Sequence, residues 1–256
     1  MAAEAGPVKM KELYFRFYGK LNKFLPDNQQ KRPFHHTFKG RQSVKDRIET
    51  VGIPHTEVEL ILANNSPVDF SYLVESGDRL AVYPHFHQLD LPASYRLREP
   101  YSRKPEFIAD VHLGKLAKYL RRFNFDTIYR NDLEDDEIIK IGVEDQRIIL
   151  TRDHGILMHK QVIYGQFIHN DDPRAQLYEV FTRYDLDKYY HGNESRCTDC
   201  NSRLVEIDKQ AIIDRLEPKT KKYFERFKIC QECDKIYWEG SHYKRMEDLF
   251  KKINNY

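Results

Sequence analysis

Two short apolar segments that each lead into an aspartate constrain this chain more than any other feature. Phe107–Ala109 runs into Asp110, and Ile148–Thr151 runs through Arg152 into Asp153. Apolar side chains at helical spacing follow the first segment, and this alternation of strand and helix predicts an open parallel α/β sheet. Because side chains at the carboxyl ends of parallel strands converge on one crevice, the two aspartates are candidates to share a divalent metal ion.

The composition is that of an ordinary soluble protein with room for two or three small domains, with 256 residues, 40% hydrophobic and 32% charged side chains. The 42 basic and 40 acidic residues nearly cancel, so no overall field marks a nucleic-acid partner. No apolar run reaches the length of a membrane span, and the N-terminus lacks the charged and apolar parts of a signal peptide. We therefore expect a cytoplasmic protein with no membrane partner.

The four cysteines form two CxxC pairs, Cys197 with Cys200 and Cys230 with Cys233. In a reducing compartment such pairs bind metal more often than they form disulfides. Four thiolates bind Zn²⁺ tetrahedrally in a closed site, which stabilises a domain too small to have much core. We expect a structural zinc ion in residues 191–256, with a helix or hairpin between the two pairs, and no catalytic zinc because no coordination position stays open.

Residues 8–87 are predicted to form a small α+β domain. The predicted order is strand, strand, helix, strand, turn and strand, which is that of a β-grasp fold. The segments are 13–18, 34–38, 43–49, 58–63, 64–65 and 77–84. Ser43 is the expected N-cap of the helix, and Gly52 is expected to end it.

This domain resembles the ubiquitin-like sulfur carriers of the ThiS and MoaD type, particularly in Val44–Asp46, Asn65–Val68 and Gly77–Pro84. Those carriers act through a C-terminal Gly-Gly that is adenylated and thiocarboxylated. Here the last strand runs instead into His85 and continues into a linker, so we expect no sulfur carriage. We interpret the domain as a module that docks a protein partner or positions RNA.

Residues 88–106 are predicted to be a linker and 107–190 the α/β domain. In that domain, the helix that ends at Phe123 should be followed by Asn124 in the left-handed conformation, which asparagine tolerates. The other expected elements are strands at 126–129, 147–150 and 162–168, and helices at 137–143 and 173–184. Asp135 or Asp136 can cap the first of these helices, and Asp172 the second.

Residues 107–256 resemble the Mut-seven C-terminal RNase-domain family, a branch of the PIN-like nucleases that carries an appended zinc ribbon. Five separated motifs carry the resemblance in the right order: Asp110–Arg121, Asp136–Ile139, Leu150–Asp153, Ser195–Asn201 and Tyr237–Tyr243. The resemblance implies a PIN-like open parallel sheet, here preceded by the ubiquitin-like β-grasp domain and followed by a zinc ribbon. It also implies an RNA substrate, cut to leave a 5′-phosphate and a free 3′-hydroxyl.

The resemblance further implies that Asp110, Asp136 and Asp153 form an acidic cluster for Mg²⁺ or Mn²⁺, hard ions that prefer oxygen ligands. A fourth acid is expected in the cluster, and Asp171 is the candidate. Other candidates for these roles are Asp172 in place of Asp171, Glu137, and Asp135 in exchange with Asp136. Each aspartate also has a simpler explanation, because an aspartate after a strand is often only a helix N-cap.

Four basic residues are predicted to contact the substrate. Lys115, Lys118 and Arg122 lie on the helix that follows the first strand and can reach phosphates, although basic residues on an outer helix face are usually only solvated. Arg152, at the end of the other strand, is predicted either to hold the scissile phosphate or to pair with the acidic cluster.

Trp238 is the predicted base-stacking residue of the ribbon. It lies among aromatic and basic side chains, as in proteins that stack bases and grip phosphates. These neighbours are Tyr237, Tyr243, Lys244 and Arg245. The alternative is that Trp238 and Tyr237 only fill the small core of the ribbon.

Two hypotheses follow from the sequence. The leading one is a metal-dependent ribonuclease in which the acidic cluster cuts RNA while the other two domains recognise the substrate or a protein partner. The alternative is a non-catalytic RNA-binding or adaptor protein that keeps the same scaffold. They differ in one respect, since an enzyme needs Asp110 and Asp153, whereas a binding protein should tolerate asparagine at both positions.

Overall fold

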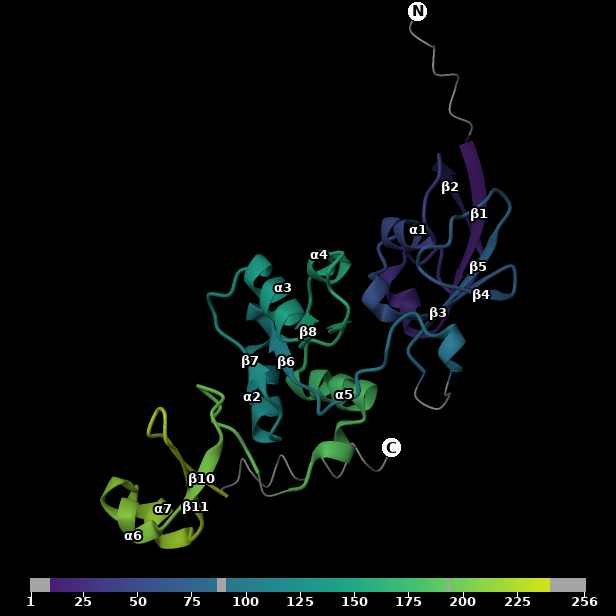
Figure 1. Ribbon diagram of the computed structural model, residues 1–256. Helices are drawn as coiled ribbons and strands as arrows, with labels where there is room; N and C mark the ends of the chain where they lie inside the picture. The colour runs from purple at the N-terminus through teal and green to yellow at the C-terminus, as the bar shows by residue number, and fades with distance from the viewer. Residues whose placement is uncertain (1–9, 87–90, 193, 240–256) are drawn as a thin grey trace, which may run out of the picture. The chain divides into compact units, whose positions relative to one another are not determined.

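The computed structural model describes residues 10–86, 91–192 and 194–239. Its elements are labelled in Figure 1, and the chain divides into two compact units. The first unit combines Met1–Ser102 with Asp153–Phe167, and the second combines Arg103–Arg152 with Ile168–Tyr256. Within the described residues, no helix has the length and apolar character that crossing a membrane requires.

The first unit is built on a five-stranded sheet with the order β2-β1-β5-β3-β4. Its strands are β1 (Met10–Phe17), β2 (Phe34–Lys39), β3 (Val58–Ala63), β4 (Ser66–Val68) and β5 (Arg79–Pro84). The first and last strands are parallel neighbours, with Tyr14 opposite Arg79 and Phe17 opposite Val82. The remaining pairs are antiparallel. This mixed sheet is consistent with the predicted ubiquitin-like domain.

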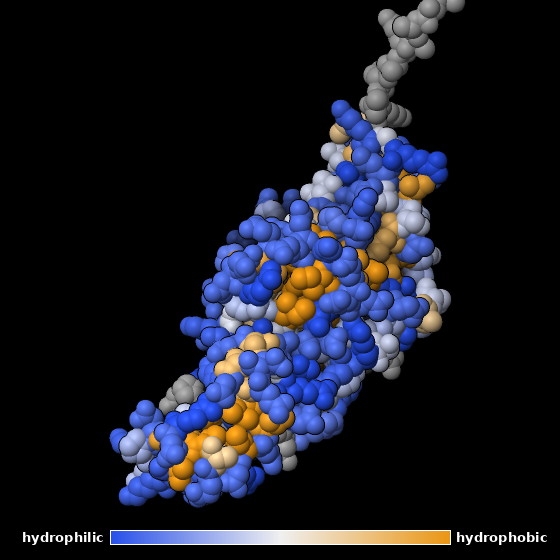
Figure 2. Space-filling model, turned by 60° about the vertical axis from the view of Figure 1, so that its left-hand side comes forward, coloured by the Kyte–Doolittle hydropathy of each residue, from blue (hydrophilic) through white to orange (hydrophobic). Residues whose placement is uncertain are grey.

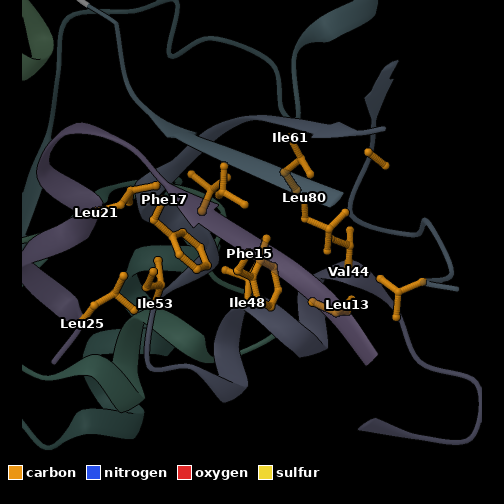
Figure 3. Close-up of a cluster of buried hydrophobic side chains, with 14 of the residues drawn as sticks. Leu13, Phe15, Phe17, Leu21, Leu25, Val44, Ile48, Ile53, Ile61 and Leu80 are labelled. Carbon is orange, nitrogen blue, oxygen red and sulfur yellow. The ribbon is translucent and has the colours of Figure 1, made fainter. Parts of the chain in front are cut away.

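Alternation along β1 builds the core of this unit. Leu13, Phe15 and Phe17 are buried on one face, where they meet side chains of α1 (Val44–Thr50), as the close-up in Figure 3 shows. The predicted cap of α1 is confirmed, because the Ser43 hydroxyl accepts from the Asp46 backbone N–H at 3.1 Å. The Asp46 carboxylate in turn accepts from the Ser43 backbone, which completes a capping box.

Several short elements of this unit were not predicted. The turn at Asn64 and Asn65 is confirmed, since both have positive φ, and it leads into the short strand β4. The unpredicted elements are β4 itself and the 3₁₀ helices η1 (Gly19–Phe24), η2 (His55–Glu57) and η3 (Ala93–Tyr95). The last of these lies in the stretch predicted as a linker.

The segment Asp153–Phe167 also folds within the first unit. It contains α4 (His154–Met158) and β9 (Gly165–Phe167), the second of which falls in the predicted strand at 162–168. Sequence reasoning predicted that strand as the fourth of the α/β sheet, within the domain of residues 107–190, and β9 is indeed the fourth strand in the order of that sheet.

In a four-stranded sheet of the order β7-β6-β8-β9, the first three strands are parallel and form the centre of the second unit. They are β6 (Phe107–Ala109), β7 (Thr127–Ile128) and β8 (Ile148–Thr151). The helices that connect and cover them are η4 (Val111–Leu113), α2 (Gly114–Arg122), α3 (Asp135–Glu144), α5 (Pro173–Tyr184) and η5 (Leu186–Tyr189). Aromatic rings of α5 pack beside the sheet. The ring centroid of Phe181 lies 5.8 Å from that of Phe125, and the ring centroid of Tyr184 lies 5.9 Å from that of Phe107 in β6. The mixed α/β fold with a parallel sheet is therefore as predicted.

The helix boundaries confirm two predictions and correct one. Asn124 has a φ of 63°, as expected after α2, and Asp172 caps α5 through the backbone N–H groups of its first turn. The predicted cap of α3 is wrong, because Glu134 occupies that position and forms a capping box with Glu137. Asp135 lies inside the first turn instead. Glu137, at position N3, reaches back to the Glu134 backbone and so favours a helix start at Glu134.

A smaller subdomain of the second unit carries the cysteines. Its antiparallel strands are β10 (Leu204–Ile207), β11 (Phe227–Cys230) and β12 (Ile236–Trp238), and α6 (Lys209–Ile212), η6 (Ile213–Arg215) and α7 (Pro218–Tyr223) lie between the two cysteine pairs. Ile212, Leu216 and Phe227 form its core. Hydrophobic side chains also reach its surface, in the lowest part of the view in Figure 2.

Candidate functional site

Asp110 follows β6 directly and is the most firmly held of the predicted site residues. Its side chain is buried, with 3% exposure. One carboxylate oxygen accepts from the Thr151 hydroxyl at 2.5 Å and from the Arg152 backbone N–H at 2.8 Å. The other accepts from the His112 backbone N–H at 2.8 Å. This arrangement follows from the parallel pairing of β6 with β8, which sets Ala109 opposite Leu150 and brings both strand ends together.

Arg152 connects this strand end to a second acid. Its backbone binds Asp110, while its guanidinium donates to the Asp171 carboxylate at 2.5 Å. The Asp171 side chain is 88% exposed. The structure therefore brings Arg152 and Asp171 together as an ion pair, which is one of the two roles predicted for Arg152.

Asp136 lies in the exposed first turn of α3. Its neighbour Glu137 is 3.3 Å from the Arg130 guanidinium. Three or more metal-ligating side chains gather, with all ligand atoms within 4.8 Å of one another, at the four cysteines alone among the described residues. Asp110, Asp136 and Asp171 are thus not drawn into one such set, and their common metal site stays a prediction.

Asp153 begins the segment that folds in the first unit. Its carboxylate caps the five-residue helix α4 by accepting from the Gly155 backbone N–H at 2.5 Å. A Cβ atom on Gly155 would lie 3.0 Å from that carboxylate oxygen, so glycine leaves room for the cap. The simpler explanation of this residue as an N-cap is therefore met, and its metal role stays a prediction.

A cleft of about 770 Å³ lies in the second unit beside Arg152 and Asp171. Five lysines or arginines line it against two aspartates, so the cleft is positively charged overall. The charged lining residues are Lys115, Lys118, Arg121, Arg130, Arg152, Asp171 and Asp199. Three of the five predicted substrate-binding residues, Lys115, Lys118 and Arg152, share this cleft.

The other two predicted substrate-binding residues, Arg122 and Trp238, line a different cavity of about 710 Å³. Arg122 is half-buried and lines a different cavity from the two lysines of α2, although helical spacing placed all three on one face. Trp238 is 42% exposed and its ring centroid is 6.4 Å from that of Phe224. Tyr243, Lys244 and Arg245 lie outside the described residues.

The four cysteines come together as predicted and could hold a zinc ion. The Sγ atoms of Cys197 and Cys233 are 3.3 Å apart, as are those of Cys200 and Cys230. All four lie within 4.8 Å of one another. A tetrahedral ion with Zn–S bonds of about 2.3 Å needs sulfur atoms about 3.8 Å apart, so this set fits zinc with little movement.

The surroundings of Cys197 favour a thiolate. Burial raises the pKa of Cys197, but backbone N–H groups of Cys200 and Asp199 and the hydroxyl of Tyr237 outweigh it, and the pKa falls to about 6. The Tyr237 hydroxyl lies 3.2 Å from the Cys197 sulfur and accepts from the Thr198 backbone at 3.1 Å. Tyr237 therefore supports the cysteine site.

Arg121 joins the cysteine site to α2, and sequence reasoning gave it no role. Its guanidinium is buried, with 3% exposure, and donates to the carbonyl oxygens of Thr198 at 2.7 Å and Asp199 at 3.0 Å, between the first two cysteines. It also donates to the carbonyl oxygen of Thr127 at 3.0 Å. A signal was present, because position 121 is four residues after Ala117 and so falls beside the buried stripe of the helix.

Asp126 and Asn201 form a second connection between the cysteine subdomain and the sheet. The Asp126 carboxylate accepts from Arg147 at 2.7 Å and from Asn201 at 3.0 Å, and it lies 3.1 Å from Arg196. The side-chain amide oxygen of Asn201 accepts from the Thr127 backbone N–H at 3.1 Å. The cysteine subdomain is therefore bonded to the start of β7 through partly buried polar groups.

The second unit is thus an α/β protein with a buried carboxylate at its strand ends, an adjoining basic cleft and a cluster of four cysteines that could hold a zinc ion. Comparison with known proteins identifies the class more closely. The chain belongs to the family described as the Mut7-C RNAse domain, which matches residues 105–250. Residues 10–90 match the family described as Mut7-C ubiquitin.

A curated relative is the "Exonuclease mut-7" of Caenorhabditis elegans, with 29% identity over 144 residues. The match covers 51% of this chain and 16% of the relative, so the chain spans only a small part of that protein's length. No solved structure matches the chain. The family and this relative together support a nuclease-type function.

Proposed function

We propose that this protein is a metal-dependent ribonuclease with a PIN-like fold, which hydrolyses RNA phosphodiester bonds at the strand ends that carry Asp110 and Arg152. The observation that carries the proposal is the buried Asp110 carboxylate, fixed by three hydrogen bonds at the end of β6. Asp110 lies within the residues that match an RNase-domain family, which supports a role for its carboxylate in RNA hydrolysis.

Asp110, Asp136 and Asp153 would hold Mg²⁺ or Mn²⁺, with Asp171 as the fourth acid. Carboxylate oxygens are the donors that such hard ions prefer. The Asp110 oxygen that accepts from the His112 backbone N–H keeps acceptor capacity for a ligand, because a carboxylate oxygen has more than one lone pair. Bound by these residues, the ion would supply activation of the attacking water and stabilisation of charge on the phosphate. Asp171 would first exchange its bond with Arg152 for the ion.

The basic cleft would bind the sugar-phosphate backbone. Lys115 and Lys118 are exposed on α2, and Arg152 reaches the same cleft from the end of β8. Once Asp171 has exchanged partners, the Arg152 guanidinium is available for the scissile phosphate, to which arginine can donate two parallel hydrogen bonds. Phosphate contacts of this kind position the strand without reading its sequence.

The remaining parts would support recognition. Arg122 and Trp238 share a cavity in which an aromatic ring and a cation could contact a further nucleotide. The cysteine subdomain would be a zinc ribbon whose ion is structural, and thiolates without disulfides suit a reducing compartment such as the cytoplasm.

The test is cleavage of labelled single-stranded and structured RNA with Mn²⁺, Mg²⁺ or EDTA. The wild-type chain is compared with the double variant Asp110→Asn, Asp153→Asn and with Asp145→Asn, an exposed aspartate at the C-terminal end of α3. We expect metal-dependent cleavage that the double variant loses and the control keeps. Mapping of the product ends should find 5′-phosphates.

The competing function is that of an RNA-binding or adaptor protein, which the positive charge of the cleft would equally support. It predicts that RNA binds but stays intact with every metal ion. It also predicts that the double variant binds RNA as tightly as the wild-type chain does. Cleavage at the wild-type rate by the double variant would refute the proposed acidic site.

A further inference from the structure

The chain makes a closed excursion after β8. It leaves the second unit at Arg152 and returns to it at Ile168. The two ends of the excursion are joined, because the Ile168 backbone N–H donates to the Thr151 carbonyl oxygen at 2.9 Å. The excursion is the segment Asp153–Phe167, and its first residue is a predicted metal ligand.

Two buried polar side chains of η2 bind the backbone of this segment. The Glu57 carboxylate accepts from the Phe167 backbone N–H at 2.8 Å, and a ring nitrogen of His55 lies 2.7 Å from the Val162 carbonyl oxygen. Glu57 is 1% exposed and His55 is 6% exposed. Bonds to charged groups in such buried positions are among the stronger ones in proteins.

These two side chains are themselves held by the β-grasp domain. The second ring nitrogen of His55 lies 2.6 Å from the Glu49 carboxylate at the end of α1. Lys20, in η1, lies 3.8 Å from the other carboxylate oxygen of Glu57. The β-grasp domain therefore orients both side chains, His55 and Glu57, toward the segment.

Three aromatic rings bind the two ends of the segment to η1. The Phe24 ring centroid lies 5.3 Å from His154 and 5.3 Å from Phe167, and those two rings are 4.6 Å apart. Such edge-to-face contacts add specific geometry to apolar burial. Ile156 and Leu157 of the same segment are buried. His154, which follows Asp153 directly, is thus part of this packing.

We propose that the β-grasp domain is a clamp for its own chain, which binds the segment Asp153–Phe167 and so fixes the backbone that carries Asp153. The surface formed by η1 and η2 has this segment as its partner. His55, Glu57 and Phe24 are positioning residues, which act on the metal site through the segment. This inference rests on the proposed function only in its last step, where Asp153 binds metal.

The experiment uses the full chain with Glu57→Ala, with Glu57→Gln, and with Asp78→Asn as matched control. Glutamine keeps an oxygen that can accept from Phe167, so it should restore what alanine loses. Asp78 is a buried carboxylate of the same domain, 5% exposed, which accepts hydrogen bonds from Asn64, Tyr72 and the Glu75 backbone. It therefore reports general loss of stability in the domain.

Two quantities are measured: amide hydrogen exchange of the segment, and the dissociation constant for Mn²⁺, followed by the electron paramagnetic resonance of the free ion. For Glu57→Ala we expect amide exchange in 162–167 to rise about tenfold. We also expect Mn²⁺ affinity to fall by about the same factor. The Glu57→Gln protein should match wild type in both quantities, and Asp78→Asn should leave Mn²⁺ affinity unchanged.

Unchanged exchange in Glu57→Ala would overturn the clamp, and so would an equal rise of exchange in this segment for Asp78→Asn. Faster exchange with unchanged Mn²⁺ affinity would overturn its link to the metal site. Neither quantity depends on RNA cleavage. If the wild-type chain binds Mn²⁺ but cuts no RNA, the proposed function fails while the clamp is still decided by these two measurements.

Discussion

The Thr151 hydroxyl donates a hydrogen bond of 2.5 Å to the Asp110 carboxylate, across the ends of two neighbouring parallel strands. Both side chains are buried, with exposures of 0% for Thr151 and 3% for Asp110. Thr151 therefore orients the Asp110 carboxylate of the proposed metal site.

Replacing Thr151 with valine keeps the shape of the side chain but removes the donor to Asp110. A hydrogen bond to a charged group contributes about 1.5–3 kcal/mol, so unfolding in urea should show a loss of that order. RNA cleavage should fall about 10- to 100-fold, because a freed carboxylate is less well oriented. Thr127→Val is the control, since Thr127 is also buried but donates to the Phe125 carbonyl oxygen. Equal losses of cleavage in both variants would contradict a specific role.

Replacing Arg121 with methionine should release the first cysteine pair from α2. The variant keeps most of the apolar length but leaves the carbonyl oxygens of Thr198, Asp199 and Thr127 without this donor. We expect a loss of about 3–5 kcal/mol in stability and faster loss of zinc to a chelator. Zinc release is followed with a colorimetric chelator, and Arg122→Met, on the next helical position, should release zinc at the wild-type rate.

The ion pairs of Asp126 predict a specific dependence of stability on pH. Burial raises the pKa of Asp126, but hydrogen bonds from Arg147 and Asn201 and the charge of Arg196 outweigh it, so its pKa lies below the ordinary 3.8. Because the folded pKa is depressed, the stabilisation is complete above about pH 5 and is lost as the pH falls through the folded value.

The corresponding variant is Asp126→Asn, measured by urea unfolding between pH 7 and pH 3. Its stability should lie about 2–3 kcal/mol below wild type at pH 7, and the difference should shrink toward pH 3. Asp145→Asn, which removes an exposed carboxylate 3.5 Å from Arg147, serves as control and should change stability by less than about 1 kcal/mol. A difference that stays constant with pH would show that the charge of Asp126 does not stabilise the fold.

The cleft predicts how RNA binding depends on salt. If Lys118 and Arg130 each contact a phosphate of a single strand, replacing either with glutamine should reduce the slope of log K against log salt by about 0.7. Binding is measured by fluorescence anisotropy at several salt concentrations, with Asp110→Asn present to prevent cleavage. Lys140→Gln, an exposed lysine of α3 that does not line the cleft, should keep the wild-type slope.

Local patterns predicted much of this protein because they report local physics. Alternating apolar residues predicted β1, Ser43 and Asp172 predicted helix starts, and Asn124 predicted a helix end. The spacing of the cysteines predicted a four-sulfur site, since each pair forms a short turn whose two sulfurs face the same way. These features depend on neighbours within a few residues along the chain, so the sequence contains them directly.

Other features depend on contacts between residues far apart in sequence, which no local pattern encodes. The bonds of Arg121 to Thr198 and of Asn201 to Asp126 span more than seventy positions, and those of Glu57 to Phe167 more than a hundred. Strand pairing decided that Thr151 would meet Asp110. Packing likewise placed Arg122 in the lining of a different cavity from Lys115 and Lys118.

The sequence by itself determined the order of strands and helices, the cysteine site and the identity of the strand-end acids, because periodicity and capping act over a few residues. Only the tertiary structure decided that Arg152 pairs with Asp171, that the cysteine subdomain is bonded to β7, and that Asp153–Phe167 folds on the β-grasp domain. The physical reason is that polar groups pair with whichever distant segment the packing brings beside them, and the buried ones among them must find such a partner.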